Sequence, residues 1–295
     1  MPMRNHLSAL LFFLLVLLYF SGFYQAVQSS VISAVILTLL LPVLFWRLVK
    51  PVDNQAEITR ILLLESGFNL LCVVALLHLL PLALMDKAFM VFFVLQAGGF
   101  LLVQRRKKAW LSFAVSVCLS FAILVWISQA GQTQVLGSGQ LQLFGTKVPW
   151  QLKAIYTLWL LQLLLVEYRY ILPKVTILLA HLASLTIALQ AEDFFHARIV
   201  TASHFLFLSL CFDFKNRDWG GREFAVLPSL VAIQKPNIAK WINYTCLGLA
   251  LLCALHLASG LVIFPNEAGK PTLSIRGTNY CASFFINALK YYFEI

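Results

Sequence analysis

Histidines inside long apolar stretches are the residues of this sequence best able to do chemistry, and five of the six histidines lie there. An ionisable side chain costs free energy inside a membrane, so it marks a functional position by default. His181 and His204 each lie about eight residues from the expected cytoplasmic ends of adjacent apolar segments, which predicts a similar depth. His78, His196 and His256 are expected nearer the outer face.

Two levels of histidines on neighbouring helices would suit one or two b-type haems, whose iron takes an imidazole from each side. The candidate ligands are His181, His204, His196 and His256. His196 and His204 are eight residues apart, so they lie on the same half of one helix, about 12 Å apart along its axis. The alternative is that the imidazoles form hydrogen bonds between packed helices, as polar side chains do in membrane bundles. Nothing else in the sequence marks a haem protein, so the sequence on its own predicts no cofactor.

A second group of polar residues lies between two apolar segments and comprises Glu192, Asp193, His196 and Arg198. Carboxylates one helical turn from an imidazole can bind a divalent cation or act as acid and base. The alternative is a solvated turn in which Arg198 pairs with Asp193. Asp86 is expected on another turn at the same side of the membrane.

The remaining polar residues give no recognisable catalytic pattern. The sequence has no Gly-x-Ser-x-Gly, His-Glu-x-x-His or paired Cys-x-x-Cys motif and no Rossmann glycine set. Five of the six cysteines fall in or at the edge of apolar runs, where they act as small hydrophobic residues. No metal site is therefore predicted. Glu65, one turn from Asn69, is expected to reach the membrane interface.

The elements that position these residues are membrane helices. Of the 295 residues 61% are apolar and only 12% are charged, whereas a soluble domain carries about a quarter charged residues. Spanning a hydrocarbon core takes about 20 helical residues. The predicted fold is an all-α, polytopic transmembrane bundle with about nine spans, at 7–28, 30–49, 61–85, 88–104, 109–128, 151–172, 173–191, 194–212 and 241–264.

The basic residues set the orientation of this bundle. With the N-terminus in the cytoplasm, fifteen of the twenty-two Lys and Arg residues fall on the cytoplasmic side, as the positive-inside rule requires. The net charge of +10 thus reports topology, and no nucleic-acid partner is expected. An odd number of spans places the C-terminus outside. The chain is thus predicted to consist of a bundle at 1–264 and an external tail at 265–295, and the tail suits an interfacial helix.

Three classes of function stay open. The first expectation is a non-catalytic component of a membrane assembly that acts at the outer side, with the tail docking onto other membrane subunits. The alternatives are a transporter of a small or lipid-like solute and a membrane-embedded enzyme or b-type haem redox protein. The predicted location is a membrane crossed many times, in bacteria the inner membrane, with the lipid bilayer itself as a partner.

The predicted topology is tested by reporter fusions. The N-terminus and the loops at 50–60, 105–108 and 213–240 are expected in the cytoplasm, because they carry the basic clusters. The loop at 129–150 and the C-terminus are expected outside. A C-terminal fusion that reports from the cytoplasm would contradict the count of nine.

Overall fold

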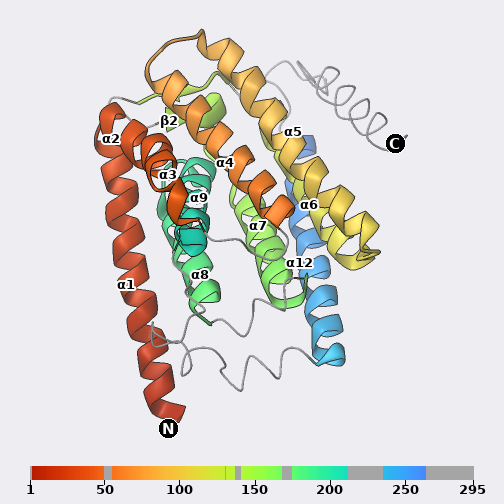
Figure 1. The fold of residues 1–295 in the computed structure, drawn as a ribbon. Helices are drawn as coiled ribbons and strands as arrows, with labels where there is room; N and C mark the ends of the chain where they lie inside the picture. Colours follow the sequence, from red (N-terminus) through yellow and green to blue (C-terminus); the bar gives the residue numbers. More distant parts are fainter. Residues whose placement is uncertain are drawn as a thin grey trace. The chain divides into compact units, whose positions relative to one another are not determined.

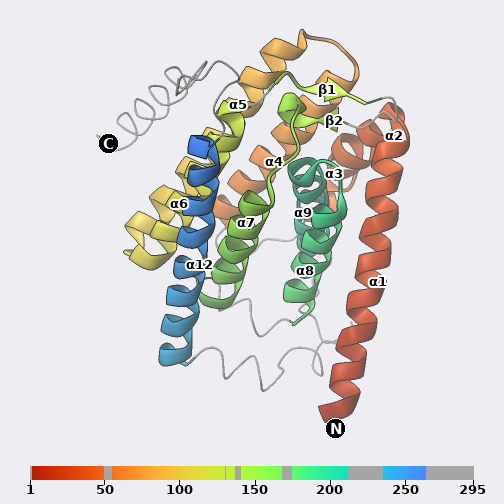
Figure 2. The same ribbon diagram turned by 180° about the vertical axis from the view of Figure 1, so that it is seen from behind.

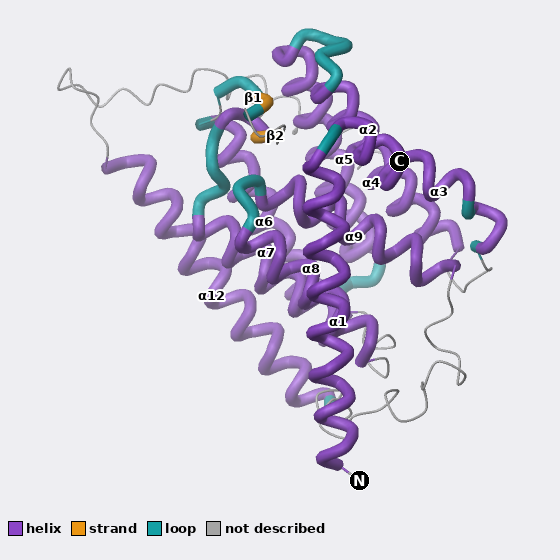
Figure 3. The backbone as a smooth tube through the Cα atoms, turned by 90° about the vertical axis from the view of Figure 1, so that its left-hand side faces the viewer, coloured by secondary structure: helices purple, strands orange, loops and turns teal. Residues whose placement is uncertain are grey.

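The described chain is almost entirely helical. The computed structural model describes residues 2–49, 55–129, 131–136, 141–167, 175–211 and 235–263. Within these ranges helices alternate with short turns, and one two-stranded hairpin is the only sheet (Figure 3). The all-α prediction is confirmed for this part of the chain. The predicted external tail lies outside it.

Six helices are long and apolar enough to cross a membrane, which is compatible with a multi-pass membrane protein. They are α1 (Pro2–Ser29), α4 (Gln55–Leu76), α5 (Leu82–Arg106), α6 (Trp110–Ser128), α9 (Phe194–Cys211) and α12 (Pro236–Ile263). Three shorter apolar helices correspond to the other predicted segments, at Val31–Leu44, Trp150–Val166 and Leu178–Gln190. Helix length thus identifies six candidate spans in the described residues, and the count of nine stays a prediction.

The second predicted span is broken into short pieces. Its backbone passes from α2 (Val31–Val35) through a π-helix, η1 (Ile36–Leu40), to α3 (Leu41–Leu44) and a 3-10 turn, η2 (Trp46–Leu48). Proline has no N–H to continue an α-helical ladder, and Pro42 stands at the start of α3. The turn before it is widened, since the N–H of Leu41 bonds the carbonyl of Ile36. A straight 20-residue helix therefore does not form here.

The boundary between the third and fourth predicted spans was placed too late. Helix α4 ends at Leu76 and α5 begins at Leu82, with Pro81 just before it. The carbonyl of Pro81 accepts the first helical bonds of α5, because proline fits a helix N-terminus and not its interior. Asp86 consequently lies inside α5 and not on a turn. His78, predicted in a helix, lies in the turn with φ of 51° and is exposed.

The chain forms two compact units. Unit 1 comprises Met1–Phe89, Gln132–Lys147 and Tyr168–Ile238, and unit 2 comprises Met90–Gly131, Val148–Glu167 and Ala239–Ile295. In unit 1, α8 (Val175–Gln190) packs against α1 and α9, and α9 packs against α4 (Figures 1 and 2). These four helices position most of the predicted site residues.

A buried polar side chain joins the helices of unit 2. Helix α7 (Trp150–Gln162), which continues into a π-turn, η4 (Leu163–Glu167), packs against α6. Gln162 is fully buried and donates to the Ser112 hydroxyl of α6 and, at 3.1 Å, to the Asn243 amide oxygen of α12. Amide and hydroxyl groups commonly join membrane helices in this way. Three helices of unit 2 thereby meet at one side chain.

The segment between α6 and α7 contributes to unit 1 through the hairpin of β1 (Gln134–Val135) and β2 (Leu141–Gln142), which is antiparallel. A tight turn follows, with Phe144 at φ of 55° and Gly145 at 60°. The Phe144 side chain is buried and its ring meets Phe89 of α5 edge-on, with centroids 6.4 Å apart. The turn thus places an aromatic side chain inside unit 1.

Substituting Gly145 tests this turn. A Cβ there would lie 2.4 Å from the Gln132 carbonyl oxygen, and L side chains are also strained at positive φ. Gly145→Ala is expected to lower the free energy of unfolding by more than about 1 kcal/mol, measured as a lower Tm in detergent. Gly98→Ala in α5 is the control, since a Cβ there meets nothing within 4 Å. Equal Tm values for the two variants would contradict the account.

Candidate functional site

Arg198 is the charged centre of unit 1. Its side chain, 3% exposed, extends from the first turns of α9 toward α8. Nη1 donates to the Ser184 hydroxyl at 2.6 Å, and Nη2 lies 3.3 Å from Nδ1 of His181. A guanidinium can only donate, so Nδ1 of His181 accepts and the imidazole proton sits on Nε2. Arg198 therefore fixes both the position and the tautomer of His181.

A directed chain of hydroxyl groups continues from this guanidinium. The Thr201 hydroxyl donates to the Ala197 carbonyl at 2.7 Å and lies 2.5 Å from the Ser184 oxygen. Because the Thr201 proton is committed, Ser184 donates to Thr201 and accepts from Arg198. Every hydrogen bond in this chain polarises the next one. The hydrogen-bonded side chains of Arg198, Ser184 and Thr201 thus join α8 to α9.

Glu65 adds an acidic group to the same region. It lies on α4, is buried, and lies within electrostatic range of Arg198. The sequence predicted that Glu65 reaches the membrane interface, and its burial shows otherwise. A carboxylate and a guanidinium from different spanning helices reduce each other's cost of burial. Glu65 is thus a site residue that sequence reasoning missed, although its charge inside an apolar segment was a signal.

Asn69 and Ser203 form a second polar pair, between α4 and α9. The Asn69 amide nitrogen donates to the Ser203 hydroxyl at 3.0 Å, and that hydroxyl donates to the Val200 carbonyl at 3.1 Å. Since the Ser203 proton is already used, only the amide nitrogen can face it. The Asn69 carbonyl oxygen must then point elsewhere. It is buried and has no hydrogen-bond partner among the described residues.

His204 is packed against α1. Its Nε2 lies 2.8 Å from the Tyr19 hydroxyl, and its ring stacks on Phe23 with centroids 3.8 Å apart. His204 is 5% exposed, and within the described chain its Nδ1 has no hydrogen-bond partner. Stacking and the tyrosine bond fix the ring. One nitrogen is left for a further partner.

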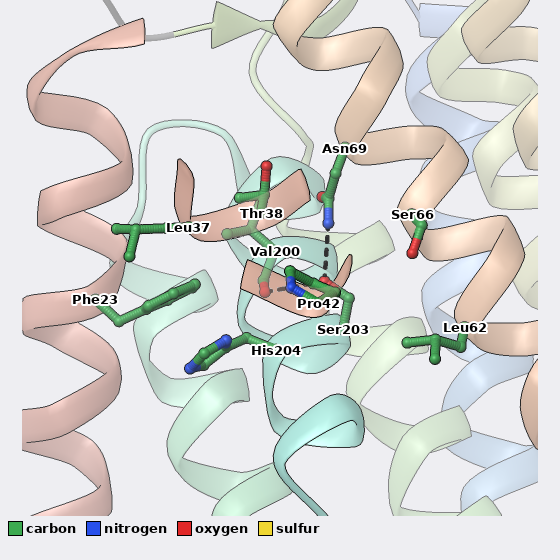
Figure 4. Close-up of a pocket in the computed structure, with 10 residues that line it drawn as sticks. All are labelled: Phe23, Leu37, Thr38, Pro42, Leu62, Ser66, Asn69, Val200, Ser203 and His204. Carbon is green, nitrogen blue, oxygen red and sulfur yellow. Dashed lines mark hydrogen bonds between the residues drawn. The ribbon is translucent and has the colours of Figure 1, made fainter. Parts of the chain in front are cut away.

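A small pocket in unit 1 lies beside Asn69 and His204 (Figure 4). Its polar lining comes from Thr38 of η1, Ser66 and Asn69 of α4, and Ser203 and His204 of α9. Apolar side chains of α1, α3, α4 and α9 complete the wall. The space open to the centre of a water-sized molecule is about 10 Å³, which is room for about one such molecule.

The two acidic residues of the predicted turn, Asp193 and Glu192, have different environments. Asp193 is the N-cap of α9: one carboxylate oxygen accepts from the backbone N–H of His196 at 2.9 Å. The other oxygen accepts from the N–H of Leu143 at 2.7 Å. Glu192 is exposed. Asp86 has a similar anchoring role, since it accepts from the backbone N–H and the hydroxyl of Thr133.

Glu192, Asp193, His196 and Arg198 therefore do not converge on one point. The His196 ring is buried and lies edge-on to Tyr24 of α1, whereas Arg198 faces α8. Within the described ranges no three His, Cys, Asp or Glu side chains gather into a possible metal site. The carboxylates of Asp86 and Asp193 instead tie the hairpin segment of 132–147 to α5 and α9.

The four histidines proposed as haem ligands have separate environments. His181 contacts Arg198, His204 contacts Tyr19, and His196 contacts Tyr24. His256 belongs to unit 2, where it lies exposed on α12 with Nδ1 2.9 Å from the Gln151 amide nitrogen. A bis-histidine site needs two imidazoles that face one iron. His181 and His204 contact side chains of unit 1, and haem binding by these histidines stays a prediction.

Asp193 is predicted to act chiefly through stability. In Asp193→Asn one backbone N–H loses its acceptor, and an unsatisfied buried donor costs about 1–3 kcal/mol. Asp193→Ala removes both acceptors and is expected to lower Tm further. Glu192→Gln is the matched control, since an exposed neighbour should change the free energy of unfolding by less than about 0.5 kcal/mol. An unchanged Tm in Asp193→Ala would refute the capping role.

Comparisons with known proteins were made against family models, curated proteins and solved structures. No family model, no curated protein and no solved structure matches this chain. What unit 1 does is therefore inferred from its own geometry and chemistry.

Proposed function

We propose that this chain is a membrane transport protein for a small polar solute, with its binding site in the pocket of unit 1. The Asn69 carbonyl oxygen carries the proposal, because it is buried, has no hydrogen-bond partner among the described residues, and belongs to a side chain that lines a space for a small molecule. A group needed only to join helices would be satisfied by the partner helix. A ligand that donates hydrogen bonds gives this oxygen a purpose.

The broken helix beside the pocket supports transport. Thr38 in the π-turn and Pro42 in α3 both line the pocket. Transporters build substrate sites from interrupted helices, because a break frees backbone groups and provides a point where the helix can bend. π-turns inside helices also occur often at functional sites. The α2 to η2 segment is therefore the element we expect to move.

The buried charges next to the pocket give further support. Arg198 and Glu65 are costly inside a spanning helix, and an apolar pair of similar volume would often be as stable or more stable. Their presence is explained if unit 1 must stay polar enough to admit a hydrated solute. In this proposal the hydroxyl chain from Ser184 to Thr201 keeps the guanidinium in place while the pocket opens and closes.

The finer topology belongs to the same proposal. The basic residues cluster in alternate loops, which supports nine crossings with the N-terminus in the cytoplasm and the C-terminus outside. The three shorter helices at Val31–Leu44, Trp150–Val166 and Leu178–Gln190 complete this count. The same charge pattern fits a bacterial inner membrane.

A non-catalytic role in a membrane assembly is the second candidate. It is favoured by the outer carboxylates of Asp86 and Asp193, which bind backbone and hydroxyl groups of the segment 132–147. The tail at 265–295, on which this expectation first rested, lies outside the described residues. Copurification of partner subunits in mild detergent, lost on deletion of the tail, would favour this candidate over transport.

Transport requires that the pocket become open to water. We expect a thiol placed there to react with a charged, impermeant methanethiosulfonate reagent from both membrane sides. The test uses Ser66→Cys and Ser203→Cys in a chain whose six native cysteines are alanine, in right-side-out and inside-out vesicles. Leu63→Cys is the control on the same helix, because Leu63 is 65% exposed on the outside of the protein and would face lipid.

Labelling of both pocket positions from both sides, with Leu63→Cys unlabelled, is the expected result. No reaction at either pocket position from either side would show a permanently closed, purely structural interior and refute the proposal. Reaction from one side only would indicate a binding protein or receptor site without transport, and would equally contradict it. Size-exclusion profiles establish that each variant is folded.

A further inference from the structure

We propose that the pocket of unit 1 binds one sodium-sized monovalent cation, held by the Asn69 carbonyl oxygen and neighbouring hydroxyl oxygens. This deepens the proposed function by naming the class of solute that the pocket takes, a small cation, and its role in transport rests on that function. Binding itself does not, and it can be measured without any flux.

The hydrogen-bond directions leave the pocket rich in acceptors. The Thr38 hydroxyl donates its proton to the Ala34 carbonyl at 2.7 Å, within its own helix. The Ser203 hydroxyl donates to Val200, and the Asn69 amide nitrogen donates to Ser203. The Thr38 and Ser203 hydroxyls therefore have oxygen lone pairs and no hydrogen left to offer, and Asn69 contributes its carbonyl oxygen. Ser66 adds a hydroxyl whose lone pairs are also available.

Acceptors of this number favour a cation over water. A water molecule can donate two hydrogen bonds, whereas the lone pairs of Asn69, Thr38 and Ser203 offer three oxygen acceptors. A small cation takes oxygen ligands in any number up to its coordination limit and needs no donor. The room for about one water-sized molecule also suits a dehydrated sodium ion.

The charge of the lining favours a monovalent ion. No carboxylate of the described ranges lines the pocket, and divalent cations such as Ca²⁺ and Mg²⁺ are usually bound through at least one carboxylate. Neutral oxygens compensate a monovalent cation more readily than a divalent one, because the free-energy cost of burying an ion rises steeply with the magnitude of its charge. Arg198 is directed toward Ser184 and His181 of α8 and does not line the pocket.

His204 can join the site in one tautomer. If Nε2 carries the proton and donates to Tyr19, Nδ1 presents a lone pair to the pocket. In the other tautomer the Tyr19 hydroxyl donates to Nε2, and Nδ1 carries a proton that would repel a cation. The 2.8 Å contact permits either direction. Bound cation should therefore select the first tautomer, which links the ion to α1.

The test measures the Tm of the purified full chain in detergent with sodium, potassium or choline chloride at equal ionic strength. A ligand that binds only the folded state raises stability with its concentration. At sodium well above its dissociation constant we expect a saturable rise in Tm of about 3 °C over choline. Asn69→Leu and Thr38→Val should each abolish the sodium effect. Ser209→Ala should keep it, because that hydroxyl bonds its own helix and lies outside the pocket.

Equal Tm values in all three salts would overturn the cation site and leave the pocket to water. A sodium effect that survives in both Asn69→Leu and Thr38→Val would overturn its location, and if Asn69→Leu fails to fold, Thr38→Val alone decides. Binding of radioactive sodium to the folded wild-type chain gives a second readout. Sodium binding with no thiol access to the pocket would refute transport alone, whereas thiol access without sodium binding would refute this inference alone.

Discussion

The cost of burying Arg198 governs the arrangement of unit 1. A guanidinium has five N–H donors and cannot give up its proton, so every neighbouring helix must offer it an acceptor or a negative charge. Helix α8 provides the Ser184 hydroxyl and the His181 imidazole, and the buried Glu65 of α4 lies within electrostatic range. These requirements fix which face of each helix turns inward.

The cost of leaving a polar group without a partner also explains how the hairpin segment of 132–147 is held. Its backbone N–H groups would be unsatisfied at the end of an apolar bundle, and two carboxylates accept from them. Asp193 serves two purposes, since it caps α9 while it binds Leu143. Residues that look like acid and base catalysts in the sequence thus hold backbone in place. Chemistry, if it resides in unit 1, belongs deeper, where Asn69 and His204 keep unused polar atoms.

Rigid and deformable elements lie side by side around the pocket. Helix α9, which lines the pocket, is joined to α8 by three linked hydrogen bonds: Arg198 to Ser184, Ser184 to Thr201, and Thr201 to the Ala197 carbonyl. The broken helix also lines the pocket, and there a π-turn and Pro42 interrupt the regular ladder. Motion is expected where backbone hydrogen bonds are fewest. In the transport proposal, α9 is therefore the fixed side of the pocket and the broken helix the movable one.

The sequence predicted the helical class, and each apolar segment does contain a helix, because length and hydropathy leave lipid-spanning backbone few alternatives. It failed where single residues override the average. Pro42 and Pro81 break or end helices inside apolar runs, so hydropathy alone joined or misplaced segments. The sequence placed His181, His204 and Arg198 in apolar segments, where the structure has them in helices α8 and α9, yet their partners were not predictable. Pairing of Arg198 with Ser184, or of Asn69 with Ser203, depends on which helices are neighbours, and sequence spacing does not encode that. Glu65 was assigned to the interface for the same reason.

The central claim is that the polar interior of unit 1 moves an ion and does not merely hold helices together. The most direct test is a sodium concentration jump on proteoliposomes adsorbed to a solid-supported membrane. The account predicts a transient positive charge displacement from the wild-type chain that is absent from empty liposomes and from folded Asn69→Leu protein. No charge displacement from folded wild-type protein, or the same displacement from the Asn69→Leu protein, would contradict it.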